Sequence, residues 1–215
     1  MSDLVANPWT GIPESDYVRH MNSPAVGQRR ALNQILADAL RTTEPRAVLV
    51  VGCSTGNGFE HIDPAITARV TGVDINPAYL QSLVNRFASQ SLALDIRCAD
   101  LSESEFEHET YDLVHAALVF EYLPWQDLLL RLAKALKLRG VLSVVLQRPS
   151  VSSAAVTPTA FTSLLALEPL FHFVDPDAVV DSAQADGLEL HERRTEPLPS
   201  GKAFEVLRLV KVGAP

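Results

Sequence analysis

Residues 47–51 (Ala-Val-Leu-Val-Val) are all apolar, and the glycine-rich stretch 52–58 follows them directly. A strand that is apolar along its whole length is typical of a parallel sheet, because helices cover both faces of such a sheet. Further strand patterns occur at residues 70–74, 92–98, 112–118 and 141–147, with helical patterns between most of them. This alternation favours an α/β fold with a mainly parallel sheet and right-handed crossovers.

Start and stop signals predict where the helices lie. Asn76 followed by Pro77 predicts a capped helix start, and Ser23 followed by Pro24 predicts another. The apolar stripes of these helices are Leu80, Leu83, Val84 and Phe87 in the first case, and Leu32, Ile35, Leu36, Ala39 and Leu40 in the second. Other helical patterns cover residues 15–21, 59–66 (with Pro64 distorting or ending it), 125–138 (stopped at Gly140), 161–167 and 176–185.

The end of the chain predicts two more strands, residues 188–194 and 203–211, joined by a turn at 197–201. They are close enough to form a hairpin, which would add an antiparallel edge to the sheet and bring it to seven strands. A chain of 215 residues suits one sizeable domain. Residues 149–160 are rich in Ser, Thr, Ala and Pro and predict a loop.

Charge and composition exclude several classes of protein. The formal net charge is −8, which disfavours binding to nucleic acid or to anionic lipid. The longest apolar runs are strand length, so we expect no membrane association. The chain shows no secretory signal and has only two cysteines, Cys53 and Cys98, so we expect a cytoplasmic protein without a disulfide. No metal site is predicted.

The glycine-rich stretch and Asp74 together predict a site for a nucleoside-containing cofactor. A turn of this kind brings a ligand close to bare backbone, and the start of the helix after it would offer unpaired N–H groups. Asp74 ends the next strand, where a carboxylate can hold the two hydroxyls of a ribose. The dinucleotide pattern G-x-G-x-x-G fits poorly, because residues 54 and 57 are Ser and Asn.

Four segments carry a more specific resemblance. They are Val-x-Gly-Cys-x-Thr-Gly-Asn-Gly at 50–58, Val-Asp-Ile-Asn-Pro at 73–77, Ala-Asp-Leu at 99–101 and Tyr-Asp-Leu-Val at 111–114. In this order and at this spacing they resemble the successive motifs of class I S-adenosylmethionine-dependent methyltransferases. The resemblance spans roughly residues 45–147. It implies a three-layer, Rossmann-like sandwich and S-adenosyl-L-methionine as the cofactor.

The resemblance also implies roles for particular residues. Gly52, Cys53, Ser54 and Gly56 would lie along the methionine part of the cofactor, with backbone of Ala116 near the same end. Asp74 would bind the ribose, Ile75 would pack on the adenine, and Asp100 with Leu101 would lie at the adenine amino group. Two positions depart from the family pattern. Val50 replaces a usual acid, and Ser54 replaces a usual glycine.

The N-terminal part, residues 1–42, is interpreted as a helical lid. In many members of the family such a segment folds over the cofactor, which would bring Tyr17, His20 and Gln28 near it. A solvated helix is the alternative. The substrate side is expected to come from residues 1–30 and from an insertion at 149–175. We expect a small-molecule acceptor, with a hydroxyl, amine or carboxylate, and a monomer or homodimer.

Methyl transfer by in-line displacement gains most from alignment, so a catalytic base need not be recognisable in the sequence. The candidates for acid–base chemistry are Glu121, Tyr122 and His20. Glu121 and Tyr122 follow the fourth strand, at the edge of the sheet where α/β proteins bind ligands. His115, inside that strand, is interpreted as a packed core histidine, and His172 as a surface residue.

Other interpretations remain open. Each motif has a structural explanation, since the glycine-rich stretch could be a tight connection, Asp74 a helix cap and Asp100 a surface acid. A non-catalytic protein that binds the cofactor or its product would fit Val50 and Ser54. Residues 52–56 also match G-x-S-x-G, the nucleophile turn of α/β-hydrolases, with Asp175 and His191 as partners. Only a loop and helices precede residue 47, whereas a hydrolase normally has several strands there.

Overall fold

The computed structural model describes residues 7–150 and 156–212. Its centre is one seven-stranded sheet in the order β3-β2-β1-β4-β5-β7-β6. The strands are β1 (Ala47–Val51), β2 (Arg69–Asp74), β3 (Leu94–Cys98), β4 (Tyr111–Ala117), β5 (Leu136–Gln147), β6 (Leu188–Pro197) and β7 (Ala203–Lys211). Strands β1 to β5 are parallel, and β7 runs antiparallel to both β5 and β6. The predicted α/β fold and its antiparallel C-terminal hairpin are confirmed.

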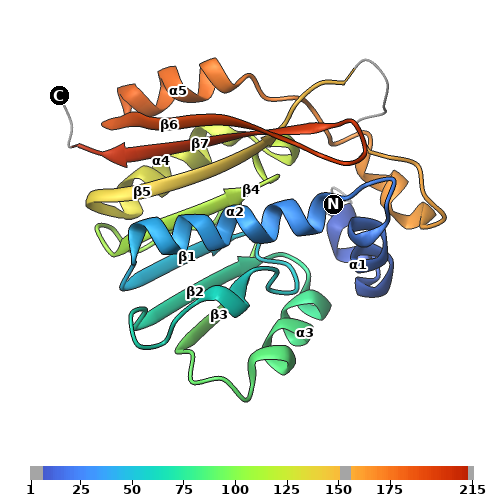
Figure 1. Ribbon diagram of the computed structural model, residues 1–215, viewed down its shortest axis with the longest axis horizontal. Helices are drawn as coiled ribbons and strands as arrows, with labels where there is room; N and C mark the ends of the chain where they lie inside the picture. Colours follow the sequence, from blue (N-terminus) through green and yellow to red (C-terminus); the bar gives the residue numbers. More distant parts are fainter. Residues whose placement is uncertain (1–6, 151–155, 213–215) are drawn as a thin grey trace, which may run out of the picture.

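Helices cover the two faces of the sheet and make three layers (Figure 1). They are α1 (Glu14–Asn22), α2 (Gln28–Thr43), α3 (Pro77–Phe87), α4 (Trp125–Ala135) and α5 (Pro176–Ala185). Four 3-10 turns complete the described elements: η1 (Pro8–Gly11), η2 (Phe59–His61), η3 (Phe120–Tyr122) and η4 (Thr162–Leu167). Residues of α2 and α3 share one core cluster with β1 and β2, and residues of α4 and α5 share the cluster on the other face.

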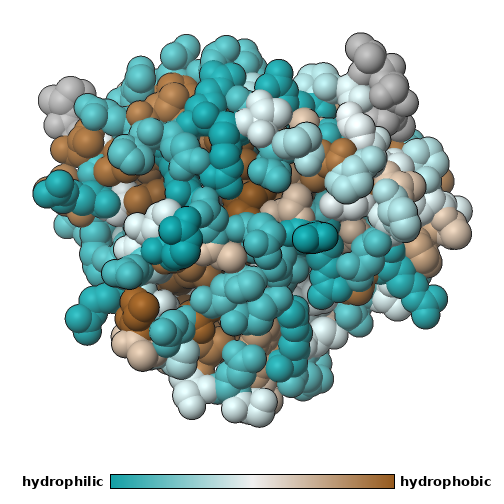
Figure 2. All heavy atoms as spheres, in the orientation of Figure 1, coloured by the Kyte–Doolittle hydropathy of each residue, from teal (hydrophilic) through white to brown (hydrophobic). Residues whose placement is uncertain are grey.

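Buried apolar residues of β1 alternate between these two clusters, as the period of a strand requires. In β1, Val48 and Val50 lie in the cluster on the α2 side, whereas Leu49 and Val51 lie in the cluster on the α4 side. All five residues of β1 are buried, which confirms the sequence interpretation of a strand covered on both faces. The α2 face carries mainly hydrophilic residues outside, with apolar ones scattered among them (Figure 2).

The predicted bounds are right for α5 and within one residue for α1, and the predicted starts of α3 and α4 are also right, whereas the start of α2 and the end of α4 are wrong. The Asn76 side chain caps α3 by accepting from the N–H groups of Ala78 and Tyr79, as expected. Ser23, however, ends α1 instead of starting α2, because the chain turns through residues 23–27 and α2 begins only after Gly27. Gly140 does not stop α4, since the helix ends at Ala135 and Gly140 lies inside β5.

The helix expected at residues 59–66 is also missing. Only the single turn η2 forms, and the chain reaches β2 without a further helix. The side chain of Leu36 in α2 packs directly against Gly58, since a Cβ at Gly58 would lie 2.9 Å from it. Helix α2 therefore occupies the surface above the glycine-rich stretch, and a long helix dipole at this stretch is absent from the described structure.

Candidate functional site

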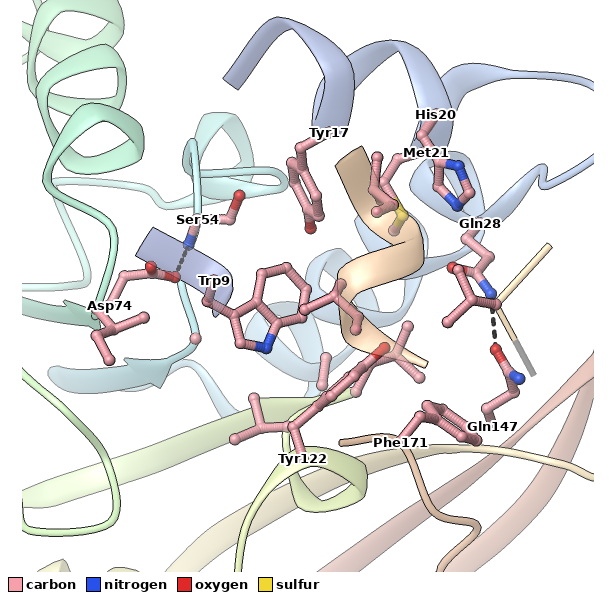
Figure 3. Close-up of a pocket in the computed structure, with 18 of the residues that line it drawn as sticks. Trp9, Tyr17, His20, Met21, Gln28, Ser54, Asp74, Tyr122, Gln147 and Phe171 are labelled. Atoms are coloured by element: carbon pink, nitrogen blue, oxygen red, sulfur yellow. Dashed lines mark hydrogen bonds between the residues drawn. The ribbon is translucent and has the colours of Figure 1, made fainter. Parts of the chain in front are cut away.

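A cavity opens at the carboxyl ends of the parallel strands, and residues of α1 and η4 line it as well (Figure 3). Loops after successive strands line it in the order of the sheet: Asp100 after β3, Asp74 at the end of β2, Gly52 after β1 and Leu118 after β4. Gln147 ends β5, and Lys202 precedes β7, at the opposite end of the row. The carboxyl edge of a parallel sheet is the usual place for a ligand in such folds.

Asp74 connects two backbone segments at this edge. Its Oδ2 accepts a hydrogen bond from the Ser54 N–H (2.9 Å), and its Oδ1 accepts one from the Asn76 N–H (2.9 Å). The side chain is 8% exposed, and burial raises the pKa of the carboxyl while the backbone donors oppose the shift. Each carboxylate oxygen can accept a second hydrogen bond. Asp74 can therefore hold the turn and face a ligand at once.

The glycine-rich stretch approaches the cavity without side-chain bulk. Gly52 has φ +65°, and a Cβ there would lie only 2.6 Å from the Val119 side chain. Ser54 also has positive φ, +48°, a conformation more usual for the glycine expected in the family. Bare backbone and a positive-φ turn suit the close approach of a ligand.

Gly56 packs against helix α3 and not against the cavity. At φ +74° its absent Cβ would meet the Phe87 ring at 2.9 Å and Leu83 at 3.0 Å, both on α3. It does not line the cavity, so the expectation that Gly56 contacts a cofactor is not supported by its placement. It allows the turn to pack against α3 instead.

Ala116 and Cys53 also lie away from the main cavity. Ala116 is buried in the core on the α4 side, and the next residue, Ala117, lines the cavity in its place. The Cys53 thiol is buried in the α2-side core, and burial raises its pKa. Cys53 borders a smaller pocket beside the glycine-rich stretch, together with Arg29 and His115.

The other predicted cofactor residues line the main cavity, namely Tyr17, Gln28, Gly52, Ser54, Asp74, Ile75, Asp100 and Leu101. Tyr17 of α1 stacks on Tyr79 of α3, with ring centroids 5.1 Å apart. Burial raises the pKa of the Tyr17 hydroxyl, and the neighbouring Ser54 side chain acts in the opposite direction. Helix α1 thus covers the glycine-rich stretch, as expected of a lid.

Of the three candidates for acid–base chemistry, Tyr122 and His20 line the cavity and Glu121 does not. Glu121 is fully buried, and its Oε1 accepts from the Gln147 N–H (2.7 Å). Burial raises the pKa of this carboxyl to about 7. In η3 this side chain is buried against the backbone of β5 and does not line the cavity, and a catalytic role for Glu121 stays a prediction.

His20 is buried at the cavity, and its Nδ1 lies 3.0 Å from the Thr159 hydroxyl. Its pKa is lowered, first by burial and then by the charge of Lys202. A hydrogen bond to Nδ1 fixes the ring orientation, and among the described residues Nε2 has no hydrogen-bonding partner. A neutral imidazole held in this way is suited to accept a proton.

Several cavity residues were missed by the sequence interpretation. Trp9 packs edge-on against Tyr122 (5.1 Å between centroids), and Phe171 does the same on the other side of Tyr122 (5.5 Å). Gln147 could have been found, because it ends a strand at the ligand-binding edge. Lys202 carries no such signal, since only the hairpin turn brings it to the cavity.

Arg29 lines the smaller pocket, which shares Tyr17, Met21, Gly52, Ser54 and Ala117 with the main cavity. A guanidinium beside bare backbone is suited to hold a carboxylate. His115, which also borders this pocket, is buried, and its Nδ1 lies 3.1 Å from the Ser143 hydroxyl. Burial and Arg208 lower the pKa of His115 to about 4, in line with its interpretation as a core histidine.

The positions of Asp175 and His191 contradict the hydrolase alternative, because neither lies near Ser54. Asp175 caps α5, and His191 is an exposed residue of the edge strand β6, whereas Ser54 follows β1. Strands β4, β5 and β7 separate β1 from β6 in the sheet. Within residues 7–150 and 156–212, no histidine is hydrogen bonded to Ser54, so the nucleophile–base pair of a hydrolase is not formed.

The sequence of residues 48–140 matches the family described as a methyltransferase domain. The match covers less than half of the chain and is a similarity to that family. No curated protein sequence matches the chain.

Solved structures share the fold of this chain over nearly its full length. The N-methyltransferase NodS of Bradyrhizobium japonicum WM9, in complex with S-adenosyl-L-homocysteine, is similar with a TM-score of 0.68 and 19% identity, covering 92% of this chain and 93% of that one. The magnesium protoporphyrin IX methyltransferase ChlM of Synechocystis PCC 6803, with the same product bound, has a TM-score of 0.68 and 15% identity, with the same coverage. The [4+2]-cyclase SpnF has a TM-score of 0.64 and 12% identity, covering 94% of this chain and 98% of that one.

Two other features bear on the class of protein. Over the described residues, no helix combines the length and apolar character needed to cross a membrane. The same part of the chain contains no group of three or more His, Cys, Asp or Glu side chains placed to hold a metal ion.

Proposed function

We propose that this protein transfers a methyl group from S-adenosylmethionine to a small-molecule acceptor in the cavity beneath α1. One observation carries the proposal. Carboxylates at the ends of β2 and β3, bare backbone after β1 and polar groups near β5 and β7 line one continuous cavity, in the order of the strands. Such a row offers separate places for a nucleoside, an amino-acid end and a second substrate.

The residues present fit the cofactor. Asp74 can accept from ribose hydroxyls while it holds Ser54, and Asp100 with Leu101 lies at the adenine end. The amino-acid end fits near Gly52 and the smaller pocket, where Arg29 can pair with its carboxylate. Bound here, S-adenosylmethionine supplies an electrophilic methyl group on a positively charged sulfur.

The chain's own residues would act mainly by position and by proton transfer. Trp9, Tyr122 and Phe171 give the acceptor apolar surfaces that limit its orientations and exclude water. The acceptor lone pair forms the new bond to the methyl carbon as the bond from carbon to sulfur breaks, and that electron pair stays on sulfur. Where the acceptor atom carries a proton, His20 receives it.

The first experiment measures cofactor binding. S-adenosylhomocysteine is titrated into the purified protein by calorimetry, with NAD as the control. We expect binding near one-to-one and a higher melting temperature, because a ligand that binds only the folded state stabilises it. Heat and thermal shift with NAD, and neither with S-adenosylhomocysteine, would contradict the proposal. An acceptor screen that detects S-adenosylhomocysteine release then tests turnover.

The second candidate is a protein that binds the cofactor or its product without turnover. Val50 favours it, because this position borders the smaller pocket and offers no carboxylate there. SpnF, a cyclase by its name, shows that the fold is also found outside methyltransferases. Release of S-adenosylhomocysteine with any acceptor excludes this candidate.

Ser54→Ala separates the proposed activity from hydrolysis. The backbone N–H of Ser54, which donates to Asp74, remains in this variant, so methyl transfer should be largely kept. A hydrolytic nucleophile could not be replaced without losing activity by several orders of magnitude. Esterase activity in the parent that vanishes in Ser54→Ala would favour the hydrolase.

A further inference from the structure

Positive and negative groups lie at opposite ends of the main cavity. Its carboxylates are Asp74 and Asp100, at the ends of β2 and β3. Its basic side chains are His20 of α1 and Lys202, directly before β7. Two strands, β1 and β4, lie between β2 and β5 in the sheet. The end that faces away from the cofactor's ribose site is therefore the cationic one.

Lys202 is an unusual residue to find at a cavity wall. It is 3% exposed, and burial lowers the pKa of its ammonium. Lysine is rarely buried to this degree, because removing an ammonium from water is costly. Lys202 and His20 line the same cavity, and the charge of Lys202 contributes to lowering the pKa of His20.

The hairpin that carries Lys202 is fixed in place. The Leu198 N–H donates to the Lys202 carbonyl (2.8 Å), and the Leu198 side chain is buried in a core cluster with Ile35 of α2. Pro199 lies against Gly27, where an added Cβ would be 3.3 Å from the proline ring. Lys202 is thus held at the cavity by packing between the hairpin and the start of α2.

Amide groups lie at the same end. Gln28 of α2 donates from its Nε2 to Gln147 Oε1 (3.0 Å), and both side chains line the cavity (Figure 3). Between this polar end and Asp74, aromatic and aliphatic side chains form the walls, including Tyr122 and Phe171. The cavity therefore presents an apolar middle that ends at a cation and polar groups.

We propose that the acceptor is a small carboxylic acid with an apolar body, and that its carboxylate binds at the end of the cavity lined by Lys202 and Gln28. This inference rests on the proposed methyltransferase function and names its substrate class. An anion at this end is complementary to Lys202 in an environment where water screens little. The same charge arrangement disfavours a cationic acceptor such as an amine without an acidic group.

The test compares acids with their amides, which share shape but not charge. Indole-3-acetate, phenylacetate and 4-hydroxybenzoate are titrated, each beside its carboxamide, into protein saturated with S-adenosylhomocysteine. We expect at least one acid to bind ten times more tightly than its amide. Lys202→Met should reduce this preference to less than threefold, and Lys202→Arg should restore most of it. The affinity for S-adenosylhomocysteine should stay unchanged in both variants.

Lys137→Met is the matched control, because it removes one lysine charge from a surface ion pair with Asp112 and leaves the cavity intact. Equal binding of every acid and its amide overturns the proposal, and so does a preference that survives Lys202→Met. Weaker S-adenosylhomocysteine binding in Lys202→Met would assign this residue to the cofactor's carboxylate instead. If Lys202→Met fails to fold, the comparison of acids with amides in the parent protein decides. Failure of S-adenosylhomocysteine to bind contradicts the proposed function before any acid is added.

Discussion

The Asp74 carboxylate accepts a hydrogen bond from the backbone N–H of Ser54 at 2.9 Å, across the boundary between β2 and the turn after β1. The second oxygen accepts from Asn76, which itself caps α3. One side chain thus joins the end of β2, the glycine-rich stretch and the start of α3. The ribose site and the shape of the turn therefore depend on the same residue.

Asp74→Ala should weaken S-adenosylhomocysteine binding at least about tenfold, because a charge-assisted hydrogen bond contributes about 1.5–3 kcal/mol and one decade in Kd is about 1.4 kcal/mol. The free energy of unfolding should also fall by about 1–3 kcal/mol, since two buried N–H groups lose their acceptor. Calorimetry and denaturant unfolding measure the two effects. Unchanged binding would show that the ribose assignment is wrong.

Gly56→Ala should lower the free energy of unfolding by about 1–3 kcal/mol. The alanine would be held at positive φ, which L residues disfavour, and its Cβ would meet Phe87 and Leu83. Gly11→Ala is the matched control, since a Cβ at Gly11 meets nothing within 4 Å. Urea unfolding of both variants measures the difference. Equal stability of the two variants would contradict the packing role of Gly56.

Much of this fold follows from the sequence because its strongest signals are local. The run 47–51 predicts β1 residue for residue, and Asn76 with Pro77 predicts the start of α3, since capping depends on neighbouring residues alone. The predicted start of α2 is wrong because it depends on a contact between distant residues. Gly27 turns there with positive φ and packs against Pro199, which lies far along the chain. Contacts of this kind leave no local pattern.

Residues of the candidate site could also be predicted only where local sequence motifs place them. Asp74 and Asp100 were found because motif spacing places them at strand ends, and the cavity contains both. The burial of Glu121 could not be predicted, because the sequence shows which turn it lies in but not which way η3 directs its side chain. Val84, expected in the apolar stripe of α3, is 41% exposed, and Tyr79 is buried in its place. Lys202 required the hairpin packing and could not be predicted.

Glu121→Gln should make stability less dependent on pH. Burial raises the pKa of Glu121 to about 7 in the folded protein, above its ordinary value of 4.5. Folding therefore favours the neutral form of Glu121. The stability that the neutral carboxyl contributes is fully present below about pH 4.5 and is lost as pH rises through about 7. Glutamine resembles the neutral acid and can still accept from the Gln147 N–H.

Melting temperatures of the parent and Glu121→Gln, measured from pH 5 to pH 8, test this expectation. The parent should lose stability relative to the variant as pH rises. A constant difference across this range would mean that Glu121 does not titrate there. Because Glu121 contacts the backbone of Gln147, its replacement should alter acceptor binding more than cofactor binding.

The pH dependence of turnover should report His20 where the acceptor atom carries a proton. Burial and the charge of Lys202 both lower the pKa of His20 below its ordinary value of 6.5, so the imidazole is neutral and able to accept a proton at pH 7. The rate, followed as S-adenosylhomocysteine release at saturating substrates, should rise with pH and level off below pH 6.5. Lys202→Met removes one of the two causes and should move this transition upward, toward 6.5.

His20→Gln should abolish the transition. It should also lower the rate about 10²–10⁴-fold, which is the usual contribution of general base catalysis, and leave the affinity for S-adenosylhomocysteine intact. A transition that stays in place in His20→Gln would assign the proton transfer to another group.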